Sequence, residues 1–281
     1  MAHERSRPAA PLSAKILLWV VLALLYLPIA VMLMGSFLEV KEGQVSATLH
    51  WFVEVFADDN LMGALKNSLL VGLFSSVLST LLGTAAAVGL YRSSSRLRGV
   101  MEGLSMVSLI FPEIVFALSL LSWFFVLKME MGLQTVIIAH VSFSLSYVMM
   151  TVNSRLVTLD SSLEDAARDL GAGEWTVLRT VILPLLKPAI VGGFILSFLL
   201  SFDDFLITYF VNGVGQDTLP VKLYTAMKMG VSPKLNALSS LMFLMTLFVL
   251  IFLFRSPSFY VLFGESKKSR DGNGSKEKEN L

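Results

Sequence analysis

Residues 163–184 form a charged stretch between long apolar runs, and they read Leu-Glu-Asp-Ala-Ala-Arg-Asp-Leu-Gly-Ala-Gly-Glu-Trp-Thr-Val-Leu-Arg-Thr-Val-Ile-Leu-Pro. Ser161 stands at the N-cap position of a first short helix, and Glu164 follows three residues on, which is the spacing of a capping box. Gly171 is expected to end this helix, because glycine tolerates the left-handed conformation of a helix stop.

A second short helix is predicted from about Glu174 to Leu183. It is expected to stop at Pro184, because proline lacks the backbone N–H that a continuing helix needs. In the first helix, Ala166, Ala167 and Leu170 form a narrow face of mostly small side chains. The stretch therefore predicts two helices joined by a glycine turn.

The composition is that of an integral membrane protein. Hydrophobic residues make up 55% of the 281 residues and charged residues 15%, whereas an ordinary soluble domain carries about 25% charged residues. The mean hydropathy is +0.72. Since the chain has no cysteine, a disulfide framework and thiolate chemistry are excluded. No Gly-Lys pair occurs, which excludes a phosphate-binding P-loop.

Six uncharged or nearly uncharged runs have about the length that crosses a bilayer. They are Ile16–Phe37, Asn67–Leu90, Gly103–Leu127, Gly132–Asn153, Pro188–Val211 and Leu235–Phe254. The predicted fold is all-α, with a permease domain at 15–255 between a tail at 1–14 and a tail at 256–281 that is disordered from about 267. Lys and Arg gather on the side of both termini, which places the termini and the 154–187 loop in the cytoplasm.

Carboxylates inside the predicted spans are the first candidates for a functional site. Glu113 lies in the third span, and Asp203 and Asp204 lie in the fifth. An acid at mid-membrane costs ~3 kcal/mol, so it needs a partner or a watery path. On an ideal helix Asp204 lies on a polar ribbon with Ser201, and Asp203 is about 100° away. Asp204 is therefore expected to face the path and Asp203 to be structural.

The fourth span carries a second polar ribbon, made by His140, Ser144, Tyr147 and Thr151. Tyr147 is taken as a candidate for the substrate path, and His140 heads the ribbon. In the first outer loop, Trp51 is either an aromatic anchor at the membrane surface or a ring that faces the outer mouth and meets a cation. Metal binding is not expected, because no second His or Cys lies at ligand spacing.

The second span has a stripe of small residues, which consists of Gly72, Ser76, Ser79, Gly83 and Ala86. Their spacing places them on one helix face. Such faces let helices approach closely in membranes, so the stripe is interpreted as a packing surface.

The 163–184 stretch resembles the coupling loop of ABC importer permeases, in which Glu-Ala-Ala, Gly and Ile-x-Leu-Pro follow at fixed spacing. The matching positions are Asp165, Ala166, Ala167, Gly171, Val181, Leu183 and Pro184, with Asp165 and Val181 as mild departures. The resemblance implies that this loop, including Glu164 and Glu174, sits in a cleft of a cytoplasmic ATPase.

Other segments resemble the polyamine branch of these permeases. They include Ser201-Phe-Asp-Asp-Phe, Leu219-Pro-Val-Lys-Leu-Tyr, Met229-Gly-Val-Ser-Pro-Lys-Leu-Asn-Ala-Leu and Pro112-Glu-Ile. That branch usually has Asp where Glu113 stands. The resemblance covers nearly all of the chain except its tails and implies a six-span, MetI-like type I fold with its core at about 65–254. It further implies import of spermidine or putrescine across a bacterial inner membrane.

The same resemblance implies the partners. These are a second homologous permease subunit in a heterodimer, a cytoplasmic ATPase dimer that uses the ATP, and a periplasmic polyamine-binding protein. The chain itself is expected to be non-catalytic, to bind no cofactor or nucleic acid, and to contact lipid.

Three alternatives remain at the level of sequence. A proton-driven secondary carrier would use the three acids as a relay, but no inverted repeat is evident. An intramembrane enzyme lacks support, because no Ser/His/Asp order or metal-ligand set stands at credible spacing. An ABC permease for a different small ligand is compatible with every motif.

Overall fold

The computed structural model describes residues 12–41, 44–93, 97–230 and 232–255. Within these residues, five helical segments are long and apolar enough to cross a membrane: Leu12–Gly35, Asp59–Arg92, Leu133–Leu156, Glu174–Phe202 and Pro233–Phe252. The predicted tail from residue 256 lies outside the described residues, whereas residues 12–14 of the predicted N-terminal tail belong to the first helix. The chain divides into two compact units, which are described separately.

The first unit extends to Asp59 and also contains residues 225–244. It holds helix α1 (Leu12–Gly35), strands β1 (Leu38–Lys41) and β2 (Gln44–Ala47), helix α2 (His50–Phe56) and the first part of α12 (Pro233–Arg255). At Gly35 an added Cβ would lie 2.8 Å from the side chain of Asn236, so α1 closely approaches α12 here. Lys234 pairs with Asp58 at 2.8 Å.

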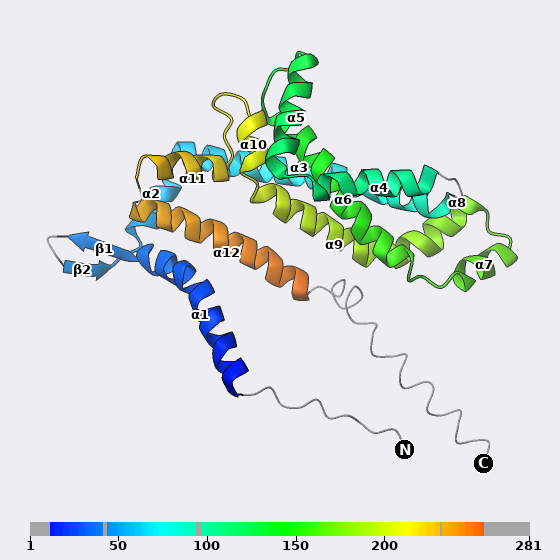
Figure 1. The fold of residues 1–281 in the computed structure, drawn as a ribbon, viewed down its shortest axis with the longest axis horizontal. Helices are drawn as coiled ribbons and strands as arrows, with labels where there is room; N and C mark the ends of the chain where they lie inside the picture. The colour runs from blue at the N-terminus through cyan, green and yellow to red at the C-terminus, as the bar shows by residue number, and fades with distance from the viewer. Residues whose placement is uncertain (1–11, 42–43, 94–96, 231, 256–281) are drawn as a thin grey trace. The chain divides into compact units, whose positions relative to one another are not determined.

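The β-hairpin departs from the all-α prediction (Figure 1). Its strands are antiparallel, with Val40 opposite Val45. Both strands alternate apolar and polar residues, which is the period of an extended strand. The hairpin was missed because strands of four residues give a weak signal beside a long apolar helix.

The second unit contains residues 60–224 and the end of α12. Its elements are α3 (Asp59–Arg92), α4 (Leu97–Ile110), α5 (Glu113–Val126), α6 (Leu133–Leu156), α7 (Ser162–Asp169), α8 (Glu174–Val177), the π-helical turn η1 (Leu178–Ile182), α9 (Leu183–Phe202), α10 (Leu206–Val211) and α11 (Leu219–Lys228), with α3 and α11 extending by a few residues into the first unit. One apolar core joins α3, α6, α8, η1 and α9, and a second joins α3, α5, α6 and α10.

The predicted third span is two helices rather than one. Helix α4 ends at Ile110 and α5 begins at Glu113. Between them stands Pro112, which cannot supply the N–H of a continuous helix. Since the prediction followed hydropathy alone, it passed over this break.

The second helix of the charged loop does not stop at Pro184, contrary to the prediction. Residues 178–182 form a π-helical turn, in which Leu183 N–H reaches Leu178 C=O, and α9 continues to Phe202. A π turn widens the helix locally. Pro184 directly follows the π turn, so its missing N–H falls where the regular α-helical bonding is already interrupted.

The start of the charged loop also differs from the predicted capping box. Ser161 makes no side-chain cap. Instead, Asp160 Oδ1 accepts from Ser162 N–H at 2.9 Å, because an aspartate in this position readily bonds a backbone amide two residues on. The predicted glycine turn is confirmed: Gly171 has φ +84° and follows α7.

The small-residue stripe of α3 is a packing surface, as predicted. A Cβ on Gly72 would lie 3.1 Å from the ring of Phe198 in α9, and one on Gly83 would lie 2.9 Å from Val148 in α6. Ser79, between them, is fully buried. The stripe therefore brings α3 against two helices of the same chain.

Candidate functional site

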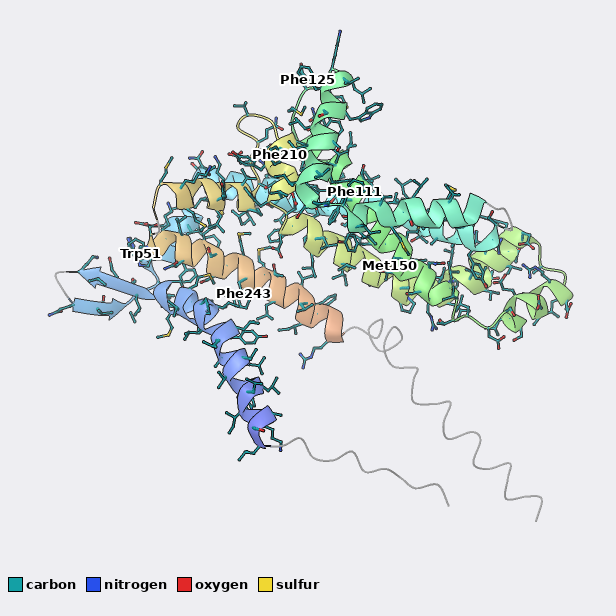
Figure 2. The ribbon with its side chains drawn as sticks, in the orientation of Figure 1. Trp51, Phe111, Phe125, Met150, Phe210 and Phe243 are labelled. Carbon is teal, nitrogen blue, oxygen red and sulfur yellow. The ribbon has the colours of Figure 1, made fainter. Side chains whose placement is uncertain are left out.

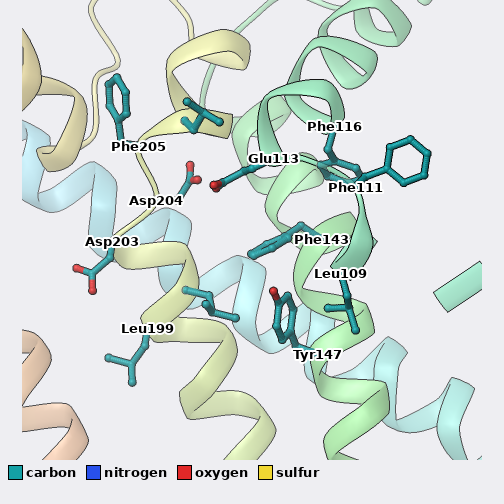
Figure 3. Close-up of a pocket in the computed structure, with 12 residues that line it drawn as sticks. Leu109, Phe111, Glu113, Phe116, Phe143, Tyr147, Leu199, Asp203, Asp204 and Phe205 are labelled. Carbon is teal, nitrogen blue, oxygen red and sulfur yellow. The ribbon is translucent and has the colours of Figure 1, made fainter. Parts of the chain in front are cut away.

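A cavity of about 690 Å³ lies in the second unit. The end of α4, the start of α5, the middle of α6 and the break between α9 and α10 surround it (Figure 3). Its lining consists of three carboxylates, five aromatic rings and four leucines: Glu113, Asp203, Asp204, Phe111, Phe116, Phe143, Tyr147, Phe205, Leu109, Leu199, Leu200 and Leu206. The lining contains no basic residue.

The carboxylates reach the cavity because two helices are interrupted. Glu113 is the first residue of α5, directly after the break at Pro112. Asp203 and Asp204 occupy the break between α9 and α10. In Figure 3, the side chains of Glu113 and Asp204 point toward one another, and Asp203 points to another side. Each carboxylate of the cavity wall therefore lies at a helix break.

The predicted continuous fifth span is therefore wrong at Asp203–Phe205. Asp204 caps the short helix α10: its Oδ1 accepts from Ile207 N–H at 3.3 Å, and its Oδ2 accepts from Thr208 N–H at 2.8 Å. These are the free amides at the start of a helix, which aspartate commonly satisfies. The side chain of Asp204 replaces the backbone bonds that the break removes.

Asp204 belongs to a buried polar network. His140 Nε2 lies 3.0 Å from Asp204 Oδ2, and the Thr208 hydroxyl donates to the same oxygen at 2.7 Å. On the other side of the ring, His140 Nδ1 lies 2.6 Å from Ser201 Oγ, which is 2.9 Å from Ser75 Oγ. His140 is 1% exposed and Asp204 is 8% exposed. The network joins α3, α6, α9 and α10.

Asp203 has a different environment. It is exposed, and its two oxygens accept from the Thr246 hydroxyl at 3.2 and 3.3 Å. A single shared hydroxyl leaves most of the acceptor capacity of this carboxylate unused. The helical wheel assumed an unbroken helix and placed Asp204 toward the path. In the structure the helix is broken, and Asp203 is the more exposed of the two aspartates.

The aromatic rings form the rest of the wall. Phe143 and Tyr147 lie one turn apart on α6 and contact edge to face, with ring centroids 5.1 Å apart. Phe205 packs against Tyr224 at 4.4 Å. Phe111 lies at the break between α4 and α5 (Figure 2). Aromatic faces attract cations, so the wall combines two kinds of group that favour positive charge.

The predicted path residues are partly brought together. Glu113, Tyr147, Asp203 and Asp204 line the cavity, whereas Ser201 does not: it is buried in the network described above. Trp51 lies in the first unit, where its indole N–H donates to Leu38 C=O at 3.0 Å. This bond joins α2 to the hairpin.

Residues that the sequence reasoning did not assign to the site include four phenylalanines and His140. Phe143 shares a helix face with His140 and Tyr147, so helical spacing could have indicated it. Phe205 directly follows the two aspartates. Phe111 and Phe116 become part of the wall only because the helix breaks at Pro112, which no periodicity predicts.

The charged loop contains a second cluster of predicted functional residues. Arg168 on α7 contacts Glu174 at 3.0 Å, and Glu164 and Asp165 at 3.3 Å. Arg92, at the end of α3, also contacts Glu174 at 3.0 Å. The hydrogen bond from Arg168 lowers the pKa of Glu174 below its usual value.

The loop also presents apolar side chains outward. Leu170 is 90% exposed and Trp175 is 70% exposed. Of the two alanines, Ala167 packs against the core and Ala166 is exposed. Leu183, half-buried, and Pro184, exposed, follow the π turn. Leu170 and Trp175 are thus large apolar side chains exposed on an otherwise charged loop.

Solved structures share this fold. A chain of a bacterial ABC transporter involved in the import of the acidic polysaccharide alginate matches with a TM-score of 0.69 and 14% identity, over 91% of this chain and 96% of that chain. A chain of the MetNI methionine ABC transporter in an inward-facing conformation matches with a TM-score of 0.58 and 16% identity, over 73% and 99%. At this identity the likeness concerns the fold.

Curated relatives are much more similar in sequence. The spermidine/putrescine transport system permease protein PotC of Escherichia coli (strain K12) is 38% identical over 231 residues, which cover 82% of this chain and 88% of the relative. PotC of Haemophilus influenzae is 37% identical, with 83% and 92% covered. The putrescine transport system permease protein PotI of Escherichia coli is 38% identical, with 77% and 80% covered.

A family model described as "Binding-protein-dependent transport system inner membrane component" matches residues 79–268. This range contains the α9–α10 break, the acidic cavity and the charged loop. The chain therefore belongs to the family of binding-protein-dependent transport system inner membrane components.

Proposed function

We propose that this chain is the transmembrane permease subunit of an ATP-driven importer that carries polyamines, such as spermidine and putrescine, into the cytoplasm. The observation that carries this proposal is the cavity with three carboxylates, five aromatic rings and no basic residue in its lining. The polyamine permeases among the relatives support the same substrate class.

Polyamines suit such a cavity for physical reasons. They carry several positive charges separated by flexible apolar chains. Carboxylates compensate the charges, aromatic faces attract the ammonium groups, and leucines contact the methylene segments. The cavity volume of about 690 Å³ lies within the range of small-molecule sites. In a transport path, each contact must bind loosely enough to release the ligand.

The proposed membrane arrangement has six crossings with both termini in the cytoplasm. Five are made by the long apolar segments, of which the Glu174–Phe202 segment crosses with its α9 part alone. The remaining crossing is assigned to α4 and α5 together, since each has 14 residues and spans only ~21 Å at 1.5 Å per residue, less than the ~30 Å hydrocarbon core. The charged loop then lies in the cytoplasm of a bacterial cell, beside the inner membrane.

The proposed partners follow from what the chain lacks and what it exposes. It has no P-loop signature, so ATP is bound and hydrolysed by a cytoplasmic ATPase dimer that would cover Leu170 and Trp175. A second homologous permease subunit completes the pathway as a heterodimer. A periplasmic binding protein delivers the polyamine. Closure of the ATPases would move the loop and rock the helices between inward- and outward-facing states.

The test is uptake by the complete importer. The chain would be co-expressed with its second permease and ATPase, reconstituted in liposomes, and supplied with binding protein and radiolabelled spermidine. The expected result is uptake that requires ATP. Unlabelled spermidine or putrescine should reduce this uptake by competition, whereas methionine and alginate oligosaccharides should not. Uptake driven by a proton gradient without ATP, or specific uptake of a different ligand only, would contradict the proposal.

A further inference from the structure

We infer that His140 is a positioning residue, which holds Asp204 in the acidic wall of the cavity by a hydrogen bond across the break between α9 and α10. His140 is not part of the cavity lining. It lies behind the wall, almost fully buried, and contacts Ser201 before the break, Asp204 within it and Thr208 beyond it. The inference rests on the proposed function, because it assigns the wall to cation binding.

The hydrogen bonds define which ring nitrogen carries the proton. Asp204 Oδ2 receives the Thr208 amide and hydroxyl as well as His140 Nε2. With three donors around one oxygen, Asp204 is the ionised acceptor and His140 Nε2 is the donor, because a carboxylate only accepts. His140 is thus the one donor to Asp204 Oδ2 that comes from a different helix.

The other ring nitrogen completes the network. In the tautomer with hydrogen on Nε2, Nδ1 accepts from the Ser201 hydroxyl. The Ser75 hydroxyl, 2.9 Å from Ser201 Oγ, also donates to Val71 C=O at 2.6 Å. Each donor of this hydrogen-bond network then meets an acceptor, as buried polar groups require. Ser201 therefore acts on the cavity through His140, which explains why it is near the site but absent from the lining.

The two carboxylate oxygens of Asp204 accept different numbers of hydrogen bonds. Oδ2 accepts three hydrogen bonds of 2.7 to 3.0 Å, whereas Oδ1 accepts one bond of 3.3 Å from Ile207. Fixing Oδ2 leaves Oδ1 with acceptor capacity for an ammonium group. The side chains of Asp204 and Glu113 point toward one another (Figure 3) and are within hydrogen-bond reach, so a cation that contacts Asp204 at this side would also contact Glu113.

Two amide variants separate the functions of the two ring nitrogens. The amide of His140→Gln reaches about as far as Nε2 and keeps a donor near Asp204. The amide of His140→Asn ends at about Nδ1, so it keeps a partner for Ser201 but loses the donor to Asp204. Ser142→Ala is the matched control on α6, because the exposed Ser142 hydroxyl bonds only Ile138 C=O of its own helix.

The experiment measures the KM and maximal rate of spermidine uptake by the reconstituted importer, normalised to the amount of complex. Loss of a hydrogen bond to a charged group predicts a KM about tenfold higher for His140→Asn, with a smaller change in maximal rate. His140→Gln and Ser142→Ala are expected to keep a KM close to that of the unmodified chain. An unchanged KM in His140→Asn, or an equal rise in both His140 variants, would overturn the inference.

A second measurement covers the case in which His140→Asn does not assemble. A buried carboxylate without its donor is destabilising, so adding Asp204→Asn is expected to restore recovery of the complex. Failure of the double variant to recover would overturn the His140–Asp204 link. Because this assay needs no substrate, it decides the link even if the importer does not carry polyamines, which would overturn the proposed function alone.

Discussion

Arg168 and Glu174 face each other across the turn at Gly171, with Arg168 Nε donating to Glu174 Oε1 at 3.0 Å. The other oxygen of Glu174 contacts Arg92 at 3.0 Å. One glutamate thus links α7, α8 and the end of α3. Under the proposed function, this link would carry a movement of the charged loop to a long apolar helix.

Glu174→Gln tests the link. The amide removes the charge that both arginines share, so the loop is expected to move less closely with α3. Because exposed ion pairs each contribute little, a partial loss of substrate-stimulated ATP hydrolysis is expected, with normal complex recovery. ATPase assays of the reconstituted complex measure this effect. Thr180→Ala, which removes an exposed hydroxyl of the same loop, is the control, and equal activity of both variants would contradict the link.

The lowered pKa of Glu174 predicts how this effect depends on pH. A carboxyl whose pKa is lower in the folded state contributes stability above its unfolded value of about 4.3, and this contribution is lost as pH falls through the folded pKa. Between pH 5.5 and 8, Glu174 therefore remains ionised. The ratio of ATPase activity between Glu174→Gln and the unmodified chain is expected to stay constant over this range. A ratio that approaches one near pH 6 would show that Glu174 is already protonated there.

Gly171→Val is expected to uncouple the importer. Gly171 has φ +84° and nothing within 4 Å of an added Cβ, so the cost is backbone strain of about 1–2 kcal/mol rather than crowding. Uptake and substrate-stimulated ATP hydrolysis should fall, while membrane insertion is kept. Gly173→Ala is the matched control, since Gly173 has φ −70° and equally open surroundings. Normal coupling in Gly171→Val would show that coupling does not need the left-handed turn at Gly171.

Gly83→Val and Ser79→Leu test the contact of α3 with its neighbours. A Cβ at Gly83 would lie 2.9 Å from Val148 and 3.0 Å from Leu145 C=O, and overpacking of this kind costs about 1–3 kcal/mol. Recovery of assembled complex is expected to fall severalfold for both variants. Gly89→Ala, on the same helix with nothing within 4 Å, should assemble normally. Normal recovery of Gly83→Val would mean that the two helices separate in the assembly.

The sequence predicted most helices, because apolar runs of membrane length and the small-residue stripe are strong local signals. It failed at Pro112 and at Asp203–Phe205, where helices break. At the second break, the side chain of Asp204 accepts the backbone N–H groups of α10 that the break leaves free. Hydropathy does not detect a break of this kind, because the surrounding residues stay apolar. The cavity could not be predicted for the same reason, since both breaks form its wall.

Individual residues show the same limit. The ribbon through Ser201 and Asp204 was predicted on an unbroken helix, but the helix breaks between these residues and both contact the buried His140. Periodicity gives the face of a helix and does not say whether a path or a neighbouring helix lies beyond it. The positive φ of Gly171 was predictable, because the turn chemistry there is local.

The most direct test of the account is spermidine uptake by the double variant Glu113→Gln, Asp204→Asn, normalised to complex abundance, beside Glu113→Asp. The account predicts that the double variant assembles and hydrolyses ATP at its basal rate but loses most uptake, because neutral amides replace two of the three carboxyl groups in the cavity lining. Glu113→Asp, which keeps the carboxylate, is expected to retain uptake. Full uptake by the double variant would contradict the claim that this acidic cavity is the cation path.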